Sequence, residues 1–281
     1  MARVSGRLFQ HRRTAMLVTL MALSAWGGAA PPALKVCADP HNPPFSNQEQ
    51  QGFENKIAEL FARDLGLAVQ YTWFPQRIGF IRNTLKKSDG PGMPYLCDLV
   101  MGVPSNFELA ATTRPYYRSS WAMVYVKGRG LDDIKSQEDL IGLAPERKKD
   151  LRIGLFDVSP AALWVARHGL MEFMTPYPML AGDARAYPGQ IIEQDLIDDR
   201  INLTFVWGPI AGYVAKRTRK HEVVVIPMRS EPGVKFDYQI AMAVRHGDDQ
   251  RRKRIQALID KHRETIRALL VEYGVPLLED P

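Results

Sequence analysis

Apolar residues in the first part of the chain repeat with two periods in turn. Residues 34–38 form a short apolar run typical of a buried strand, and residues 68–74 alternate as a second strand does. Between them, residues 53–65 place apolar side chains at helical spacing. A helix at 77–86 and a third strand at 97–102 continue the series. This order predicts a parallel sheet covered on both faces by helices.

The same alternation returns further along the chain, after a longer strand and two glycines. The expected strands are 121–126, 151–156, 203–207, 223–227 and 238–244. The expected helices are 159–168, 191–199 and 209–216, with a final helical stretch that carries Ile255, Leu258, Ile259, Ile266, Leu269 and Leu270 on one face.

These elements predict an α/β protein of two lobes, with a hinge and a cleft between the lobes. Lobe 1 comprises residues 34–126 plus 229–281, and lobe 2 comprises residues 127–228. Ligands of such sheets lie at the carboxyl ends of the strands, so the cleft is the expected binding site.

The N-terminus has a different pattern, which indicates where the protein resides. Four arginines and no acid precede an apolar run at 15–23, and residues 24–30 are mostly small. This is the pattern of a secretory signal peptide, and the run is much shorter than the ~20 residues of a membrane span. We expect cleavage after Ala29, which makes 1–29 the signal peptide, and a periplasmic mature chain without a membrane span.

Charge then excludes one class of partner. Removing the four arginines of the signal peptide lowers the formal net charge from +6 to +2. The mature chain has no basic tract with interleaved aromatic residues, so nucleic-acid binding is not expected. The basic run at 251–254 is most simply a solvated helix face.

The chemistry-bearing residues are few. Cys37 and Cys97 are the two cysteines of an exported chain, which favours a disulfide, with two buried thiols as the alternative. No metalloprotease, nucleophile-elbow or phosphate-binding motif is present, so we expect no enzyme activity and no metal site in this chain.

Several runs carry a family resemblance. The element order resembles the type II periplasmic solute-binding proteins (solute-binding protein family 3). More specific runs are similar to the methanol-oxidation J proteins, MxaJ and XoxJ; they are 36–40 with Asn42, 44–47, 52–55, 71–73, 75–77, 101–104, 113–119 and 207–213. Residues 88–95 are a local insertion, which departs from the family pattern close to Cys97.

The resemblance implies a function beside a quinoprotein. J proteins are partners of methanol dehydrogenase, which uses pyrroloquinoline quinone (PQQ) with calcium or a lanthanide. That cofactor belongs to the dehydrogenase, so no cofactor is expected in this chain. The expected partner is the large subunit, with a c-type cytochrome nearby, and the implied role is assembly or activation of the enzyme. The alternative is a receptor for a small molecule of methanol or C1 metabolism.

Two departures from the amino-acid-binding relatives favour the accessory role. Those proteins hold a carboxylate with an Arg placed nine residues before a Pro-Tyr pair, where this chain has Asn106. They often hold an ammonium group with an Asp where this chain has Trp207. Asn106 is equally explained as a turn residue, and the alternative for Trp207 is a packed core side chain.

The complete set of expected cleft residues follows from these positions and from the loops around them. For Arg114 an ion pair is the commoner role, and Ser159 also has the position of a helix cap. The expected cleft residues are Asn42, Phe45, Trp73, Gln76, Asn106, Arg114, Asp157, Ser159 and Trp207.

Overall fold

The computed structural model describes residues 1–2, 32–178 and 186–279. The predicted signal peptide therefore lies, apart from its first two residues, outside the described part of the chain. Residues 32–281 form one compact unit, and only this unit is considered below. Within the described residues no helix is long and apolar enough to cross a membrane.

The first three long strands form the predicted parallel sheet. β1 (Ala33–Ala38) lies between β4 (Ala68–Trp73) and β5 (Leu99–Pro104), and both pairings are parallel. Leu99 and Met101 of β5 join one apolar cluster, while Val100 and Val103 join another. Because side chains alternate along a strand, both faces of the sheet are buried, as expected.

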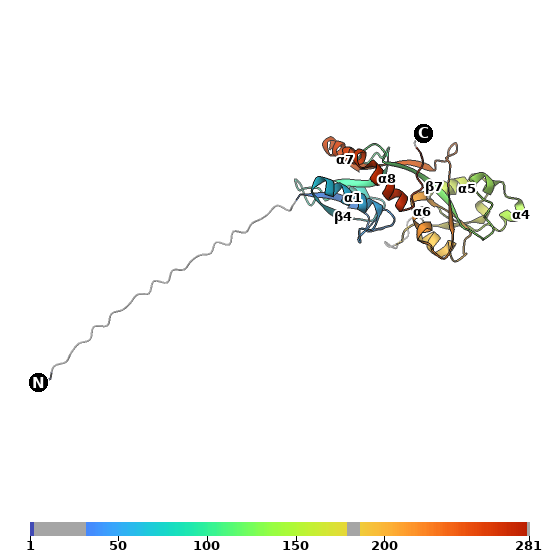
Figure 1. Cartoon of the computed structure of the whole chain (residues 1–281), viewed down its shortest axis with the longest axis horizontal. Helices are drawn as coiled ribbons and strands as arrows, with labels where there is room; N and C mark the ends of the chain where they lie inside the picture. Colours follow the sequence, from blue (N-terminus) through green and yellow to red (C-terminus); the bar gives the residue numbers. More distant parts are fainter. Residues whose placement is uncertain (3–31, 179–185, 280–281) are drawn as a thin grey trace. The chain divides into compact units, whose positions relative to one another are not determined.

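Helices cover these two faces. On the first, α1 (Phe53–Leu65) buries Ile57 and Phe61 completely and ends at Gly66, whose left-handed backbone closes the helix. The C-terminal helices α7 (Asp249–Lys261) and α8 (Arg263–Glu272) join the same cluster, and α1 contacts both β4 and α8 (Figure 1). The short helix α2 (Phe80–Asn83) lies on the second face.

Two strands connect the first part of the sheet with the rest. In β7 (Tyr117–Val126), residues 117–120 pair with β12 (Asp237–Val244), whereas residues 121–126 pair with β10 (Leu203–Trp207) and β11 (Val223–Pro227). Further along, β12 pairs with β5 in an antiparallel ladder. Both strands therefore belong to more than one ladder. The predicted lobe limits are consistent with this layout but remain a prediction.

The second half of the chain repeats the layered design. β8 (Ile153–Phe156) pairs in parallel with β10 and with β9 (Met174–Tyr177). α5 (Pro160–Arg167) packs Trp164 against Phe205 on one face. α6 (Gly208–Arg217) and the π-helical turn η2 (Ile191–Leu196) cover the other face.

Several elements differ from the sequence-based prediction. The helix expected at 77–86 is only the four residues of α2, because Gly79 precedes it with φ +88° and Thr84 bonds its hydroxyl back to the Phe80 carbonyl. The helix expected at 191–199 is the shorter η2. β7 begins four residues before the predicted strand.

Short elements complete the fold in segments to which the sequence analysis assigned no helix or strand. They are β2 (His41–Asn42), β3 (Ser46–Asn47), β6 (Ala111–Thr112), α3 (Gln137–Ile141), α4 (Pro145–Lys148) and the 3-10 turn η1 (Met171–Phe173).

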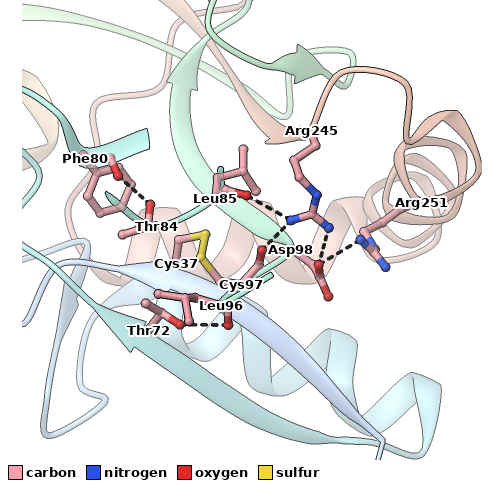
Figure 2. The surroundings of a disulfide bond; sticks show 10 residues. All are labelled: Cys37, Thr72, Phe80, Thr84, Leu85, Leu96, Cys97, Asp98, Arg245 and Arg251. Atoms are coloured by element: carbon pink, nitrogen blue, oxygen red, sulfur yellow. Dashed lines mark hydrogen bonds and ion pairs between the residues drawn. A yellow bond between two sulfur atoms is a disulfide. The ribbon is translucent and has the colours of Figure 1, made fainter. Parts of the chain in front are cut away.

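The predicted disulfide joins Cys37, near the end of β1, to Cys97, which lies two residues before β5. Cys37 and Cys97 are bonded, with their Cα atoms 5.4 Å apart, and both are buried (Figure 2). The insertion at 88–95 closes on itself through a bridge between Ser88 and Tyr95, so the backbone reaches Cys97 in a position that permits the bond.

Candidate functional site

A cavity of about 560 Å³ lies where loops of the parallel sheet face the second half of the chain. We call it the cleft cavity. One wall consists of residues after β1 and β4: Asp39, His41, Asn42, Phe45, Pro75, Gln76 and Arg77. The opposite wall consists of residues from β8 to α6: Phe156, Tyr177, Pro178, Ala186, Tyr187, Pro188, Gln190, Ile191, Gln194, Asp195 and Ile210.

The first wall is held together by one carboxylate. Asp39 follows β1, and its side chain accepts hydrogen bonds from the backbone N–H of His41 at 2.8 Å and of Gln76 at 2.6 Å. The Asn42 amide donates to Oε1 of Gln76 at 3.1 Å, which links the same two loops again. Phe45 packs edge-on against Phe53 at 5.2 Å. This wall therefore presents an aromatic ring between amide groups whose positions are fixed.

The second wall is aromatic as well. Tyr177 lies near Phe156 and donates its hydroxyl proton to Asp195 at 2.6 Å. Burial and this contact with an anion raise the pKa of the Tyr177 hydroxyl. Asp195 also accepts a hydrogen bond from Arg200 at 2.5 Å, so its charge is neutralised within the wall. Burial and Glu193 likewise raise the pKa of Tyr187.

The carboxylates and the arginine that line the cleft cavity already interact with other groups of the protein. Asp39 is used by backbone amides and Asp195 by Arg200 and Tyr177. Arg77 also has an interaction within the chain. What remains for a guest is aromatic and proline surface, the imidazole of His41, and the side-chain amides of Asn42, Gln76, Gln190 and Gln194. Such a lining suits an uncharged occupant.

A buried acid lies beside the first wall. Glu54, in the first turn of α1, is almost fully buried, and burial followed by the nearby charge of Asp39 raises its pKa to about 8. A β-carbon added at Gly102, whose φ is +69°, would lie 2.3 Å from Oε1 of Glu54. The Gly102 position therefore has to be a glycine for two reasons: its backbone conformation and its contact with this acid.

Comparison with known proteins identifies the family. No family model matches the chain. The protein MoxJ of Methylorubrum extorquens is 27% identical over 261 residues, which is 87% of this chain and 81% of that protein. The crystal structure of the periplasmic binding protein XoxJ from Methylobacterium extorquens AM1 is 32% identical, with a TM-score of 0.69, and the match covers 88% of this chain and 100% of XoxJ. The chain belongs to the MoxJ/MxaJ/XoxJ family.

Two further structures support the fold of this J protein. MxaJ from Methylophaga aminisulfidivorans has a TM-score of 0.71 at 25% identity, over 88% of this chain and all of that one. An ancestral cationic amino acid solute-binding protein has a TM-score of 0.64 at 19% identity, over 86% of this chain and 95% of that one, which shows the fold alone. The predicted type II periplasmic binding protein fold is therefore confirmed.

Three of the nine expected cleft residues of this J protein line the cleft cavity. Asn42, Phe45 and Gln76 all come from the first wall. Whether they contact a ligand stays a prediction, because the geometry shows only where they lie.

The three remaining residues of the first half lie elsewhere. Trp73 stacks on Tyr71 with ring centroids 4.5 Å apart. Asn106 is exposed in the turn after β5. Arg114 forms an ion pair with Asp260 at 2.6 Å, the commoner role considered for it. None of the three lines the cleft cavity.

The three expected residues of the second half also lie outside the cavity lining. Asp157 is exposed at the end of β8. Ser159 caps α5 by accepting a hydrogen bond from the Ala162 amide at 3.2 Å, as its position suggested. Trp207 packs against Tyr238, at 5.8 Å between ring centroids, which is the packed alternative considered for it.

Sequence reasoning missed the second wall. Tyr177 and Tyr187 lie in a Pro- and Gly-rich stretch that has no helical or strand period, so no pattern pointed to them. One signal was present: each of these tyrosines is followed directly by a proline, which favours an extended backbone at the tyrosine. Among the described residues no group of three or more His, Cys, Asp or Glu side chains could hold a metal ion.

Proposed function

We propose that this J protein is a periplasmic accessory protein that docks on a PQQ-dependent methanol dehydrogenase and assists assembly or activation of that enzyme. Membership of the MoxJ/MxaJ/XoxJ family supports the proposal. In this proposal PQQ and calcium or a lanthanide are held by the dehydrogenase, with a c-type cytochrome nearby. The J protein itself supplies binding surface and no catalysis.

The aromatic lining of the cleft cavity, whose carboxylates are hydrogen-bonded within the walls, is the observation that carries the proposal. A receptor for a charged metabolite needs an uncommitted charge opposite to that of its ligand, whereas Asp39 and Asp195 are already bonded within the walls. The centres of protein–protein contacts are enriched in aromatic side chains and depleted in charged ones. The cleft cavity would accept an uncharged loop of the dehydrogenase large subunit.

A pull-down with a tagged mature chain tests the partner. The bait is incubated with periplasm of its own host grown on methanol, once with and once without a lanthanide. We expect recovery of a methanol dehydrogenase large subunit in one of the two conditions. A Phe45→Ala/Tyr177→Ala variant, which removes one ring from each wall, should recover much less. The exposed Val158→Ala variant is the matched control.

The outcome that contradicts the proposal is equally concrete. No dehydrogenase in either condition, together with normal holo-enzyme levels in a strain lacking the J protein, would exclude both docking and assembly.

The second candidate is a small-molecule receptor, which the size of the cleft cavity favours. A ligand at a hundredfold excess over its Kd would stabilise the protein by about 2.7 kcal/mol. A thermal-shift screen with uncharged quinones and C1 metabolites would detect this, and an unchanged midpoint across the screen would exclude the candidate.

A further inference from the structure

A second concave surface lies on the parallel-sheet half, between α2 and the turn after β5. Its volume is about 510 Å³, and Phe80, Ile81 and Val103, all buried in the core, form part of its lining. Ile78 is 88% exposed and Leu109 is 53% exposed, and both line it too. We call this surface the α2 groove. Apolar side chains exposed next to a concave apolar surface mark an interaction site rather than scattered surface residues.

The charge of the α2 groove has one sign. Arg77, Arg82 and Lys86 all line it, and within the described residues no Asp or Glu does. Arg82 and Lys86 are exposed, and neither has an ion pair in the described part of the chain. An apolar groove whose charged side chains are all cations attracts an apolar segment that carries carboxylates.

Hydrogen bonds fix the backbone of α2 and of the residues after it, which form one wall of the α2 groove. Thr84 donates its hydroxyl to the Phe80 carbonyl at 2.7 Å, and Arg245 donates to the Leu85 carbonyl at 3.1 Å. The disulfide between Cys37 and Cys97 joins the same apolar cluster as Phe80 and Leu85 (Figure 2). A groove whose wall is already fixed loses less entropy when a partner binds.

We propose that the α2 groove docks a segment of a partner protein in which apolar side chains are flanked by aspartate or glutamate. The inference goes beyond the accessory role, because it concerns a different surface; the two surfaces share only Gln76 and Arg77. The N-terminal segment of the chain itself is a poor occupant, since residues 3–31 contain arginines and no acid. The occupant is therefore a separate acidic chain.

A random peptide library displayed on phage supplies the probe. Selection on the mature protein should enrich peptides that place Asp or Glu beside aliphatic or aromatic residues. In fluorescence anisotropy, an enriched peptide should bind at least about tenfold more weakly when its carboxylates are replaced by amides, and its affinity should fall with added salt.

Paired variants locate the site. Arg82→Glu/Lys86→Glu should weaken binding about tenfold or more, whereas Lys87→Glu/Arg254→Glu, which changes the net charge equally at exposed positions outside the groove, should leave it within about twofold. Ile78→Ser/Leu109→Ser should likewise weaken binding. Val158→Ser/Leu163→Ser, at exposed apolar positions on the other half of the chain, should not.

Each other outcome overturns the inference. Enrichment of basic or uncharged peptides, equal binding by the groove and control variants, or no enrichment would each do so. Vesicles of phosphatidylglycerol that bind the protein through the same residues, without peptide binding, would assign the groove to a lipid surface. Self-association that Ile78→Ser/Leu109→Ser abolishes would assign it to a second copy.

Discussion

Asp39 shows how one side chain can have a role that its sequence context hides. It stands two residues before His41 in a Pro-rich loop, and such a pair in sequence could suggest a metal site. In the structure its two oxygens accept hydrogen bonds from the amides of His41 and Gln76 and so tie the loops after β1 and β4 together. The carboxylate is a structural brace for the first wall of the cleft cavity.

Glu54 makes a residue-scale prediction about pH. Its pKa is about 8 in the folded chain and near 4.5 when unfolded. Between these values the folded state keeps a proton that the unfolded state has lost, so the free energy of unfolding decreases as pH rises through this window. Glu54→Gln removes this titration. At pH 8 the variant should be more stable than the parent by roughly 2–5 kcal/mol.

Urea denaturation between pH 5.5 and 8.5 measures this effect. Glu49→Gln, at an exposed position in the loop before α1, is the matched control and should follow the parent. A Glu54→Gln profile parallel to that of the parent would show that Glu54 is ionised throughout and would contradict the prediction.

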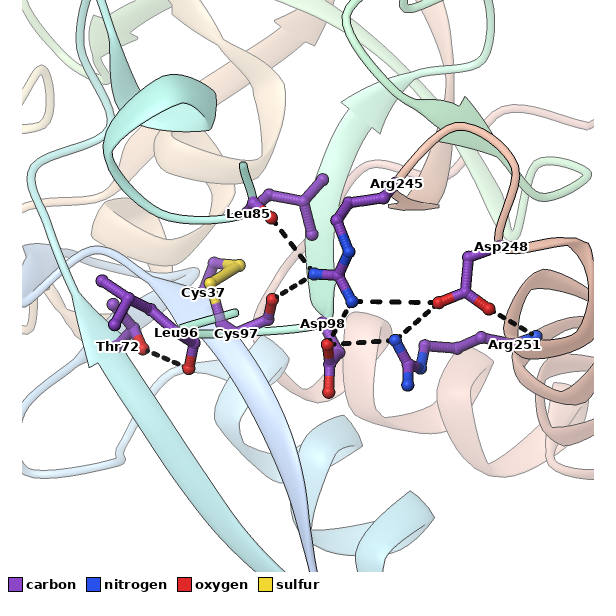
Figure 3. A network of polar contacts seen from close by, with 9 residues as sticks. All are labelled: Cys37, Thr72, Leu85, Leu96, Cys97, Asp98, Arg245, Asp248 and Arg251. Carbon is purple, nitrogen blue, oxygen red and sulfur yellow. Dashed lines mark hydrogen bonds and ion pairs between the residues drawn. A yellow bond between two sulfur atoms is a disulfide. The ribbon is translucent and has the colours of Figure 1, made fainter. Parts of the chain in front are cut away.

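At the scale of elements, Arg245 connects segments that are far apart in the sequence. Placed directly after β12, it donates to the carbonyls of Leu85 and Cys97 and forms an ion pair with Asp98 (Figure 3). Its guanidinium lies 4.1 Å from the centre of the Tyr95 ring. Arg251 of α7 also bonds Asp98, at 3.0 Å. One side chain thus holds the insertion, the segment after α2 and the disulfide region against the sheet.

Arg245→Met should therefore destabilise the protein by about 3 kcal/mol, because two carbonyls and Asp98 lose a largely buried partner. Arg252→Met removes an exposed ion pair with Asp249 and should cost less than about 1 kcal/mol. Urea denaturation compares the two variants. Equal losses would mean that the interactions of Arg245 add nothing beyond those of a surface arginine.

Some helices and strands could be predicted from the sequence and others could not. β1, β5 and α1 were predicted because apolar residues recur along each of them: α1 packs one face against the first cluster, whereas β1 and β5 bury side chains on both faces of the sheet. The start of β7 was not predicted, because Ser119 and Ser120 are typical turn residues in sequence. Both are fully buried in the structure, and Ser119 donates its hydroxyl to the Pro276 carbonyl at 2.7 Å. That partner lies 157 residues away, so no local pattern could have indicated it.

At the scale of the molecule, two continuous chain segments, β7 and the stretch 234–244 that contains β12, pass between two sets of cores. Tyr117 of β7 belongs to the apolar cluster of the parallel sheet, whereas Met123 and Val124 belong to the two clusters of the second half. The element order was enough to predict two strand crossings. The expected residues that line the cleft cavity all come from one wall, because the wall with Tyr177 and Tyr187 depends on a tertiary fold around an aperiodic stretch.

The shared strands predict that the two halves unfold together. Ile57→Ala removes a fully buried side chain from the first cluster and Leu155→Ala one from the second half, at a cost of about 2–5 kcal/mol each. Loss of either core releases one end of β7 and of its ladder partners, so the other core loses the strand that it shares. Both variants should therefore lower the midpoint of one common transition.

Circular dichroism and tryptophan fluorescence should report that transition at the same urea concentration. Val271→Ala, at a position 52% exposed on α8, should leave the midpoint nearly unchanged. Two separate transitions, each moved by only one of the core variants, would show that β7 and β12 act as flexible tethers. The two halves would then be independent folding units, and the geometry of the cleft cavity would depend on a partner rather than on the strands.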